Sequence, residues 1–392
     1  MISFQSVSKV YPDGTPAVQD LTIEIPTGKI TVFVGPSGCG KTTSLRMINR
    51  MIEPTGGTVL IDGKDTRSID APTLRRGIGY VIQNAGLFPH RTVLDNVATV
   101  PVLQGQNKRA ARAAAVELLA RVGLDTAMGK RYPAQLSGGQ QQRVGVARAL
   151  AADPPVLLMD EPFSAVDPVV RTQLQDELIR LQAELGKTIV FVTHDIDEAV
   201  KLGDRIAVFA VGGRLAQYAE PSEVLSRPAD DFVADFVGRD RGYRALSFVV
   251  SGDLPLHPEP TLALGTEVPV GAGSAAEGIS DDHGRWLLVV DEKRAPRGWL
   301  DCRTVPPGHR VTREDLVLGG SLAGPGASLR TALDAALSSP SGRGVAVDGD
   351  LAVVGTVAAR DVLDAIEQAR TESEDSPVPL SEALPSMTRA TR

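Results

Sequence analysis

Eight consecutive residues have the types and spacing of a loop that binds phosphate groups. They are Gly35, Pro36, Ser37, Gly38, Cys39, Gly40, Lys41 and Thr42. Glycines suit such a loop because side chains would keep the backbone N–H groups from wrapping the phosphates, and the helix that follows adds a favourable dipole. Lys41 would reach the β- and γ-phosphates of a nucleotide, and Thr42 would be a ligand of Mg²⁺.

Two carboxylates and a histidine follow apolar runs further along the chain. Asp160 and Glu161 end the run 156–159, and His194 ends the run 189–193. Each feature alone is common in proteins, because many buried strands end in a solvated polar turn. Together with the phosphate loop they acquire roles: Asp160 can hold Mg²⁺ through water, and Glu161 can orient or deprotonate the water that attacks the γ-phosphate. We expect His194 to contact the γ-phosphate, since ligand sites lie at the carboxyl ends of parallel strands.

A second phosphate-binding turn is predicted at the start of a helix that follows Leu136. The turn contains Ser137, Gly138, Gly139 and Gln140. A helix N-terminus of this kind binds anions, yet one nucleotide has no need of two such turns from one subunit. The simplest arrangement is therefore two chains head to tail, with the turn of each closing on the nucleotide held by the other.

The elements that must position these residues alternate between strands and helices. The apolar run 30–34 leads into the phosphate loop, and residues 43–51 read as a helix. The alternating residues Leu21, Ile23 and Ile25 predict a half-buried strand. Buried strands alternating with amphipathic helices indicate an α/β fold with a parallel sheet. Residues 88–152 are poor in β-branched residues and are expected to form a helical subdomain.

Length and composition limit the remaining possibilities. The 392 residues exceed what one core usually supports, so two or three domains are expected. The net charge of −7 disfavours a general nucleic-acid binder. No apolar run approaches the length of a membrane helix, no secretory signal is visible, and Cys39 and Cys302 are too few for a disulfide framework. These features predict a protein of the reducing cytosol.

A domain boundary is expected near residue 240, where the composition changes. Residues 241–392 carry 15 basic and 21 acidic side chains and a single lysine. A weak repeat, Leu288-Val289-Val290-Asp291 and Val345-Ala346-Val347-Asp348, with a glycine seven residues after each aspartate, predicts strand, turn and strand twice. Residues 371–392 are expected to be a disordered tail.

The motifs of the first 238 residues resemble those of the ATP-binding cassette family, whose fold joins a phosphate-loop core sheet, an antiparallel part and a helical subdomain. The resemblance implies binding of ATP and Mg²⁺ and hydrolysis of ATP, with Lys41, Glu161 and His194 catalytic. It implies that Tyr11 stacks on adenine, that Thr43 also contacts the nucleotide, and that Gln83 joins Thr42 and Asp160 at Mg²⁺. Asp167 resembles the loop acid that crosses the dimer interface, although the leucine usual before it is Val166 here.

Residues 47–57, 79–90 and 140–143 resemble the glycine betaine, choline and proline importer branch of the family. The implied partners are a second cassette in a head-to-tail homodimer, a separate membrane permease at the cytoplasmic face of the cell membrane and, indirectly, an extracytoplasmic solute-binding protein. The same architecture also serves amino-acid, sulfate and polyamine importers and non-transport cassettes acting on ribosomes or DNA, and these remain alternatives.

Residues 241–370 resemble a pair of cystathionine-β-synthase domains, a smaller α/β regulatory unit. In that family a Ser or Thr lies three residues before a ribose-contacting Asp, but Ala358 occupies that position before Asp361. The first copy is degenerate: it places Asp301 and Thr304 at these positions, and Pro306 follows where a helix should begin. Adenine-nucleotide sensing is therefore not expected. A scaffold that only dimerises the cassettes and an oligonucleotide-fold tail are the alternatives.

Overall fold

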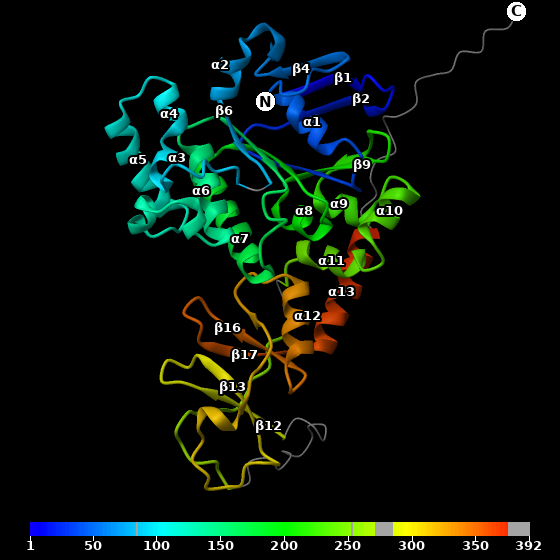
Figure 1. Ribbon diagram of the computed structural model, residues 1–392. Coiled ribbons are helices and arrows are strands. Elements are labelled where there is room, and N and C mark those ends of the chain that lie inside the picture. The colour runs from blue at the N-terminus through cyan, green and yellow to red at the C-terminus, as the bar shows by residue number, and fades with distance from the viewer. Residues whose placement is uncertain (84, 252–253, 271–284, 375–392) are drawn as a thin grey trace, which may run out of the picture. The chain divides into compact units, whose positions relative to one another are not determined.

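The computed structural model describes the chain except for residues 84, 252–253, 271–284 and 375–392 (Figure 1). The chain divides into two compact units, one spanning Met1–Arg239 and one beginning at Asp240. Each unit has hydrophobic clusters of its own. No helix in the described ranges is long and apolar enough to cross a membrane.

The first unit opens with an antiparallel sheet of four strands in the order β2-β1-β4-β5. Its strands are β1 (Ile2–Val10), β2 (Pro16–Ile25), β4 (Gly56–Ile61) and β5 (Lys64–Asp65). Leu21, Ile23 and Ile25 on β2 are buried, while Asp20, Thr22 and Glu24 between and before them are exposed. The alternation in the sequence therefore predicted this strand correctly.

A six-stranded sheet in the order β10-β9-β3-β8-β7-β6 forms the centre of the first unit. All neighbours are parallel except β10, which is antiparallel to β9. The strands are β3 (Ile30–Val34), β6 (Ile78–Val81), β7 (Val156–Asp160), β8 (Thr188–Val192), β9 (Arg205–Ala210) and β10 (Arg214–Ala219). Every residue of β3, β7 and β8 is buried, which explains their continuous apolar runs. The predicted α/β fold is confirmed.

Helices surround this sheet and gather to one side of it in residues 93–150 (Figure 1). That group contains α3 (Val93–Val97), α4 (Thr99–Leu103), α5 (Lys108–Arg121) and α6 (Gly138–Leu150). The other helices of the unit are α1 (Lys41–Ile48), α2 (Ala71–Arg76), α7 (Pro168–Leu185), α8 (Ile196–Leu202), α9 (Pro221–Ser226) and α10 (Asp231–Val237). The stretch predicted as helical, 88–152, contains α3–α6.

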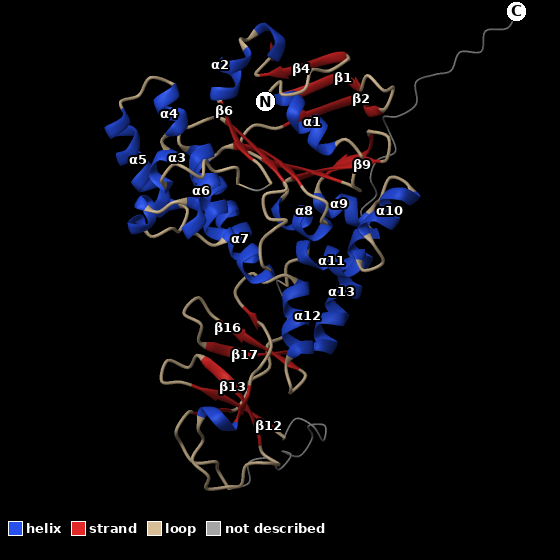
Figure 2. Ribbon diagram, viewed as in Figure 1, coloured by secondary structure: helices blue, strands red, loops and turns tan. Residues whose placement is uncertain are grey.

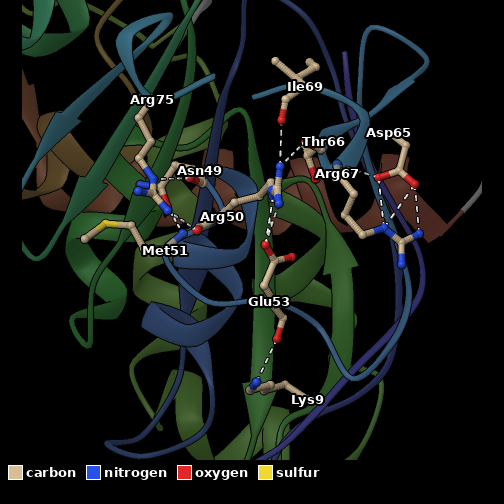
Figure 3. Close-up of polar contacts among 10 residues, drawn as sticks. All are labelled: Lys9, Asn49, Arg50, Met51, Glu53, Asp65, Thr66, Arg67, Ile69 and Arg75. Carbon is tan, nitrogen blue, oxygen red and sulfur yellow. Dashed lines mark hydrogen bonds and ion pairs between the residues drawn. The ribbon is translucent and has the colours of Figure 1, made fainter. Parts of the chain in front are cut away.

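The C-terminal end of α1 is anchored by two arginines (Figure 3). Arg50 has a positive φ of 54° and donates hydrogen bonds to the backbone oxygens of Thr66 (3.2 Å) and Ile69 (2.7 Å). Arg75 donates to the backbone oxygens of Asn49 (3.2 Å) and Arg50 (2.5 Å). The bonds from Arg75 satisfy two carbonyls just after the end of α1, and those from Arg50 tie the same segment to the backbone of residues 66–69.

The second unit contains two small sheets and two longer helices, α12 (Leu329–Ser338) and α13 (Ala359–Glu374), which lie side by side (Figure 2). One sheet has the order β11-β12-β13-β14 and the other the order β15-β16-β17. Their strands are β11 (Thr261–Ala263), β12 (Trp286–Val290), β13 (Pro296–Asp301), β14 (Leu316–Val317), β15 (Leu322–Ala323), β16 (Arg343–Val347) and β17 (Val353–Ala358), and a short helix α11 (Arg241–Ala245) precedes them.

The repeat seen in the sequence is two strand–turn–strand units of the same geometry. The pairs β12–β13 and β16–β17 are both antiparallel with a register shift at the same place. In each turn an aspartate, Asp291 or Asp348, accepts the backbone N–H groups two and four residues further on at 2.9–3.0 Å. Arg294 and Leu351 then adopt positive φ values of 61° and 64°. The predicted order of strand, turn and strand is confirmed in both copies.

The structure tests two expectations for the second unit, the start of the C-terminal tail and the loss of a helix after Pro306. Helix α13 continues to Glu374, so the predicted start of a tail at Thr371 is wrong: the regular pattern ended earlier in the sequence than the helix does. The rest of that predicted tail, 375–392, lies outside the described residues. After β13 the chain forms turns and a short 3₁₀ helix (Arg313–Asp315) before β14, in agreement with the helix-breaking effect of Pro306.

Candidate functional site

The phosphate loop lies between β3 and α1 and needs glycine at two points. A Cβ on Gly35, at φ 148°, would lie 2.3 Å from the backbone oxygen of Phe209. A Cβ on Gly40, at φ 94°, would lie 2.1 Å from the backbone oxygen of Ala17. The adjacent backbone excludes any larger residue at both positions. The loop therefore presents main chain where a phosphate must approach closely.

Lys41 is the first residue of α1 and is only 5% exposed. Its Nζ donates to the backbone oxygens of Gly35 (2.7 Å) and Pro36 (2.8 Å) and lies 3.7 Å from Sγ of Cys39. The ammonium group is thus held over the loop by acceptors of the loop itself. Burial raises the pKa of the Cys39 thiol, which keeps this thiol protonated at neutral pH.

Thr42 and Asp160 lie together although 118 residues separate them. Thr42 Oγ1 donates to Asp160 Oδ1 at 2.8 Å. Asp160 ends β7 and is buried, and Thr42 is in the first turn of α1. A hydroxyl and a carboxylate side by side form an oxygen donor set of the kind that Mg²⁺ prefers.

Glu161 and His194 face each other one and two residues beyond the ends of the adjacent parallel strands β7 and β8. Glu161 Oε2 and His194 Nδ1 are 3.2 Å apart. Glu161 has a positive φ of 45° and its N–H donates to the backbone oxygen of Val192 at 3.0 Å. A non-glycine residue in this conformation is strained. Both side chains line a cavity of about 30 Å³, which is large enough for a water molecule.

Tyr11 and Gln83 reach the same region from other elements. Tyr11 follows β1, is 36% exposed, and its Oη lies 3.3 Å from Thr43 Oγ1 on α1. Gln83 follows β6 and its Nε2 donates to Ser164 Oγ at 3.4 Å. Ser164 Oγ in turn donates to the backbone oxygen of Glu161 at 3.0 Å. The structure thus joins Gln83 to the loop after Glu161, while its place beside Thr42 and Asp160 stays a prediction.

The turn predicted to be a second phosphate-binding site begins α6 and is built as a capping box. Ser137 Oγ accepts the N–H of Gln140 (3.3 Å), and Gln140 Oε1 accepts the N–H of Ser137 (3.0 Å). Ser137 and Gly138 are exposed. A Cβ on Gly139 would lie 2.7 Å from Cγ1 of Val170 on α7, so this glycine permits the two helices to pack. The turn leaves the N-terminus of α6 open to solvent.

The residue predicted as the loop acid, Asp167, also has a local function. Its Oδ1 accepts the N–H of Val169 at 2.9 Å, which caps the N-terminus of α7. The side chain is also exposed, so the cap leaves one carboxylate oxygen available to a partner.

Several contacting residues were missed by sequence reasoning. Arg46 and Tyr80 both hydrogen-bond Asp160. Arg148, near the end of α6, donates to the backbone oxygens of Ala85 and Gly86 at 2.7 Å each, and burial lowers the pKa of its guanidinium. The spacing of four residues from Thr42 to Arg46 would have placed both on one helix face. Nothing in the sequence pairs Arg148 with the loop after Gln83.

Comparison with known proteins identifies the family of this chain. A family model described as ABC transporter matches residues 18–164. An osmoprotectant import ATP-binding protein of Salmonella typhimurium is 48% identical over 309 residues, which are 77% of this chain and 80% of that protein. A choline transport ATP-binding protein of Bacillus subtilis is 42% identical over 332 residues, which are 82% of this chain and 86% of that protein.

A solved structure shows the same fold in a nucleotide-bound state. It is a dimer of an ATP-binding cassette, described as a post-hydrolysis state bound to ADP and Pi. It is 36% identical to this chain and covers 56% of it and 99% of its own length, with a TM-score of 0.52. The phosphate loop, the Asp160–Glu161 pair and the turn at Ser137 all lie within residues 18–164, which the family model matches. The chain belongs to the ATP-binding cassette transporter family, as one of its ATP-binding and ATP-hydrolysing subunits.

Proposed function

We propose that this cassette powers the import of an osmoprotectant such as glycine betaine, choline or proline. The observation that carries the proposal is the reach of the similarity to importer subunits. The alignment to the osmoprotectant import protein spans 309 residues, whereas the first unit has 239. The similarity therefore continues into the second unit, where no ATP motif constrains the sequence. Shared ancestry of both units favours a shared cargo class over an amino-acid, sulfate or polyamine importer.

The site residues divide the work of ATP hydrolysis. The loop from Gly35 to Thr42 holds the phosphates, with Lys41 at the β- and γ-phosphates. Thr42 and Asp160 are the oxygen donors that fit Mg²⁺, with Gln83 as a further ligand; bound there, the ion neutralises phosphate charge. Tyr11, beside Thr43 at the start of α1, stacks on the adenine.

Glu161 and His194 act at the γ-phosphate end of the site. The carboxylate of Glu161 orients and deprotonates the attacking water. His194, 3.2 Å from that carboxylate and with an imidazole that is more than half exposed, contacts the γ-phosphate. Their shared position beyond the ends of β7 and β8 supports this pairing.

The exposed turn at Ser137 supports a head-to-tail homodimer. The hydrogen bonds of this turn are local, so the turn makes no such bond to the phosphate loop of its own chain. The turn consists of Ser137, Gly138, Gly139 and Gln140. In the dimer each turn closes on the γ-phosphate held by the other chain, and Asp167 crosses the interface. The dimeric cassette with ADP and Pi supports this arrangement.

The dimer works at the cytoplasmic face of the cell membrane, bound to a separate permease, and an extracytoplasmic solute-binding protein delivers the cargo. The second unit acts as a regulatory pair related to cystathionine-β-synthase domains. A non-transport cassette acting on ribosomes or DNA is disfavoured by the relatives at 42–50% identity, which are named as transport or uptake proteins.

The cargo is tested by uptake. The chain is co-produced with the permease and solute-binding proteins encoded beside its gene, in cells that lack osmoprotectant importers. Uptake of radiolabelled glycine betaine, choline and proline is compared with that of sulfate, spermidine and glutamine, using Lys41→Ala as the control for ATP dependence. ATP-dependent uptake of an osmoprotectant is expected. Uptake confined to sulfate, spermidine or glutamine refutes the cargo assignment.

A further inference from the structure

The two carboxylate oxygens of Asp160 have separate partners. Oδ1 accepts the hydroxyl of Thr42 at 2.8 Å. Oδ2 accepts the hydroxyl of Tyr80 at 3.2 Å and Nη2 of Arg46 at 3.3 Å. Nε of Arg46 also donates to Tyr80 Oη at 3.4 Å, so the three side chains form a closed triangle.

Three elements bring this triangle together. Asp160 ends β7, Tyr80 lies on the neighbouring parallel strand β6, and Arg46 lies one helical turn beyond Thr42 on α1. Asp160 is 8% exposed at its side chain and Arg46 is 42% exposed. Burial raises the pKa of the Tyr80 phenol, so this hydroxyl stays protonated and remains a donor at neutral pH.

A carboxylate rotates readily about its last torsion, because that torsion has broad, roughly twofold minima. Donors on Oδ2 oppose this rotation, and they leave Oδ1 as the oxygen that faces Thr42. Outer partners of this kind orient a metal-binding carboxylate, and their loss typically weakens metal binding about 10- to 100-fold.

We propose that Tyr80 and Arg46 are positioning residues that fix the orientation of the Asp160 carboxylate, so that its Oδ1 stays beside Thr42 as a preformed pair of oxygen donors for Mg²⁺. The proposal rests on the assignment of Thr42 and Asp160 to Mg²⁺ under the proposed function. Tyr80 contributes geometry alone, since it carries no charge. Arg46 contributes geometry and also lowers the cost of burying the Asp160 charge.

Tyr80→Phe removes one hydroxyl and keeps the ring, the charge of Arg46 and the fold of β6. Tyr218→Phe is the matched control: Tyr218 lies on β10 of the same sheet, burial raises its pKa in the same way, and its hydroxyl donates to the backbone oxygen of Glu24 at 2.7 Å. Tyr80→Phe loses the bond to Asp160 and the bond accepted from Arg46, whereas Tyr218→Phe loses the bond to the backbone of Glu24. Only one of them loses a bond to Asp160.

The readout is the binding of a fluorescent ATP analogue to the full-length chain as Mg²⁺ is titrated. In Tyr80→Phe the Mg²⁺ concentration at half-saturation should rise by about 10- to 100-fold, while binding without Mg²⁺ and kcat at saturating Mg²⁺ stay within about threefold of wild type. Tyr218→Phe should leave the titration unchanged. An unchanged Mg²⁺ titration in Tyr80→Phe, or a loss of kcat that saturating Mg²⁺ does not restore, overturns the positioning role.

Two further variants distinguish a failure of the positioning role of Tyr80 from a failure of the assignment of Thr42 and Asp160 to Mg²⁺. Thr42→Ala should abolish the Mg²⁺ dependence; if it does not, the assignment of Thr42 and Asp160 fails, whatever Tyr80→Phe does. Arg46→Gln provides a second test of the triangle if Tyr80→Phe melts at a markedly lower temperature than wild type. It should shift the Mg²⁺ half-saturation at least as far as Tyr80→Phe, and a smaller shift counts against the proposal.

Discussion

Glu161→Gln tests the assignment of the catalytic base most directly. The substitution keeps the size of the side chain and removes its charge and its basicity. The backbone at this residue is fixed by its own N–H, which donates to Val192 at 3.0 Å, and by a positive φ of 45°. Glutamine can keep both features. The change therefore removes a chemical function while the loop keeps its shape.

The magnitude follows from the contacts of the residue. A positioned general base contributes about 10²- to 10⁴-fold in rate, which is about 2.7 to 5.5 kcal/mol in the barrier. The side chain of Glu161 has its hydrogen bond with His194, whereas Lys41, Thr42 and Asp160 are held by other partners. We therefore expect kcat to fall by this factor, with the affinity for MgATP changed by less than about threefold.

The assay measures phosphate release and binding of a fluorescent ATP analogue on the same full-length preparation. Glu184→Gln is the control, since Glu184 is an exposed glutamate on α7 that pairs with Arg121 and Arg180 at the surface. The control should keep wild-type turnover. If Glu161→Gln hydrolyses ATP within about threefold of wild type, or loses nucleotide binding along with turnover, Glu161 is not the base.

The remaining predictions concern the dimer and the second unit. Glu161→Gln should form an ATP-bound dimer in light scattering, and adding Ser137→Arg should abolish it. Glu259→Gln leaves the buried guanidinium of Arg343 without its carboxylate and should cost about 3 to 5 kcal/mol, measured by denaturation with tryptophan fluorescence, since both tryptophans lie in the second unit. The pKa of Asp315 is lowered to about 2; its stabilisation is present above about pH 4 and is lost as the pH falls toward 2, so Asp315→Asn should destabilise the unit at pH 6 but not at pH 2.

The parts of the site set by local pattern were predictable from the sequence. The phosphate loop can be recognised in the sequence because the surrounding backbone requires glycine at positions 35 and 40. The strand before the loop is recognisable as a continuous apolar run. The ends of β7 and β8 were predictable for the same reason. The sequence therefore predicts the positions of Asp160, Glu161 and His194 at the carboxyl ends of β7 and β8.

Contacts made across the fold were not predictable in this way. Tyr80 lies on β6, and the hydrophobic pattern of that strand predicts only that the strand is buried. The hydrogen bond from Tyr80 to Asp160 depends on the register between β6 and β7, which the sequence does not show. The hydrogen bonds from Arg148 to the carbonyls of Ala85 and Gly86 could not be predicted, because every residue has a backbone carbonyl and the sequence does not mark which one is used. The helical cap made by Asp167 was visible in principle, since Pro168 follows it at the first helical position.

In the second unit, the absence of a side-chain hydroxyl at Ala358 argues against nucleotide binding, but it is not the whole physical reason. Asp361 is present where a ribose contact would be expected, but its Oδ2 lies 2.7 Å from Nε2 of His257 and accepts the N–H of Ala358 at 3.3 Å. The segment that carries His257 pairs with β17 at Thr356. Two residues on, Glu259 accepts the hydroxyl of Thr356 and binds the buried Arg343.

A ribose at Asp361 would have to displace the imidazole of His257, whose side chain is 49% exposed, from the carboxylate. The obstacle to nucleotide binding at this copy is therefore a competing contact made by the chain itself, in addition to the absence of a hydroxyl at Ala358. Restoring the hydroxyl alone would leave His257 in place, so we do not expect Ala358→Thr to confer binding of AMP.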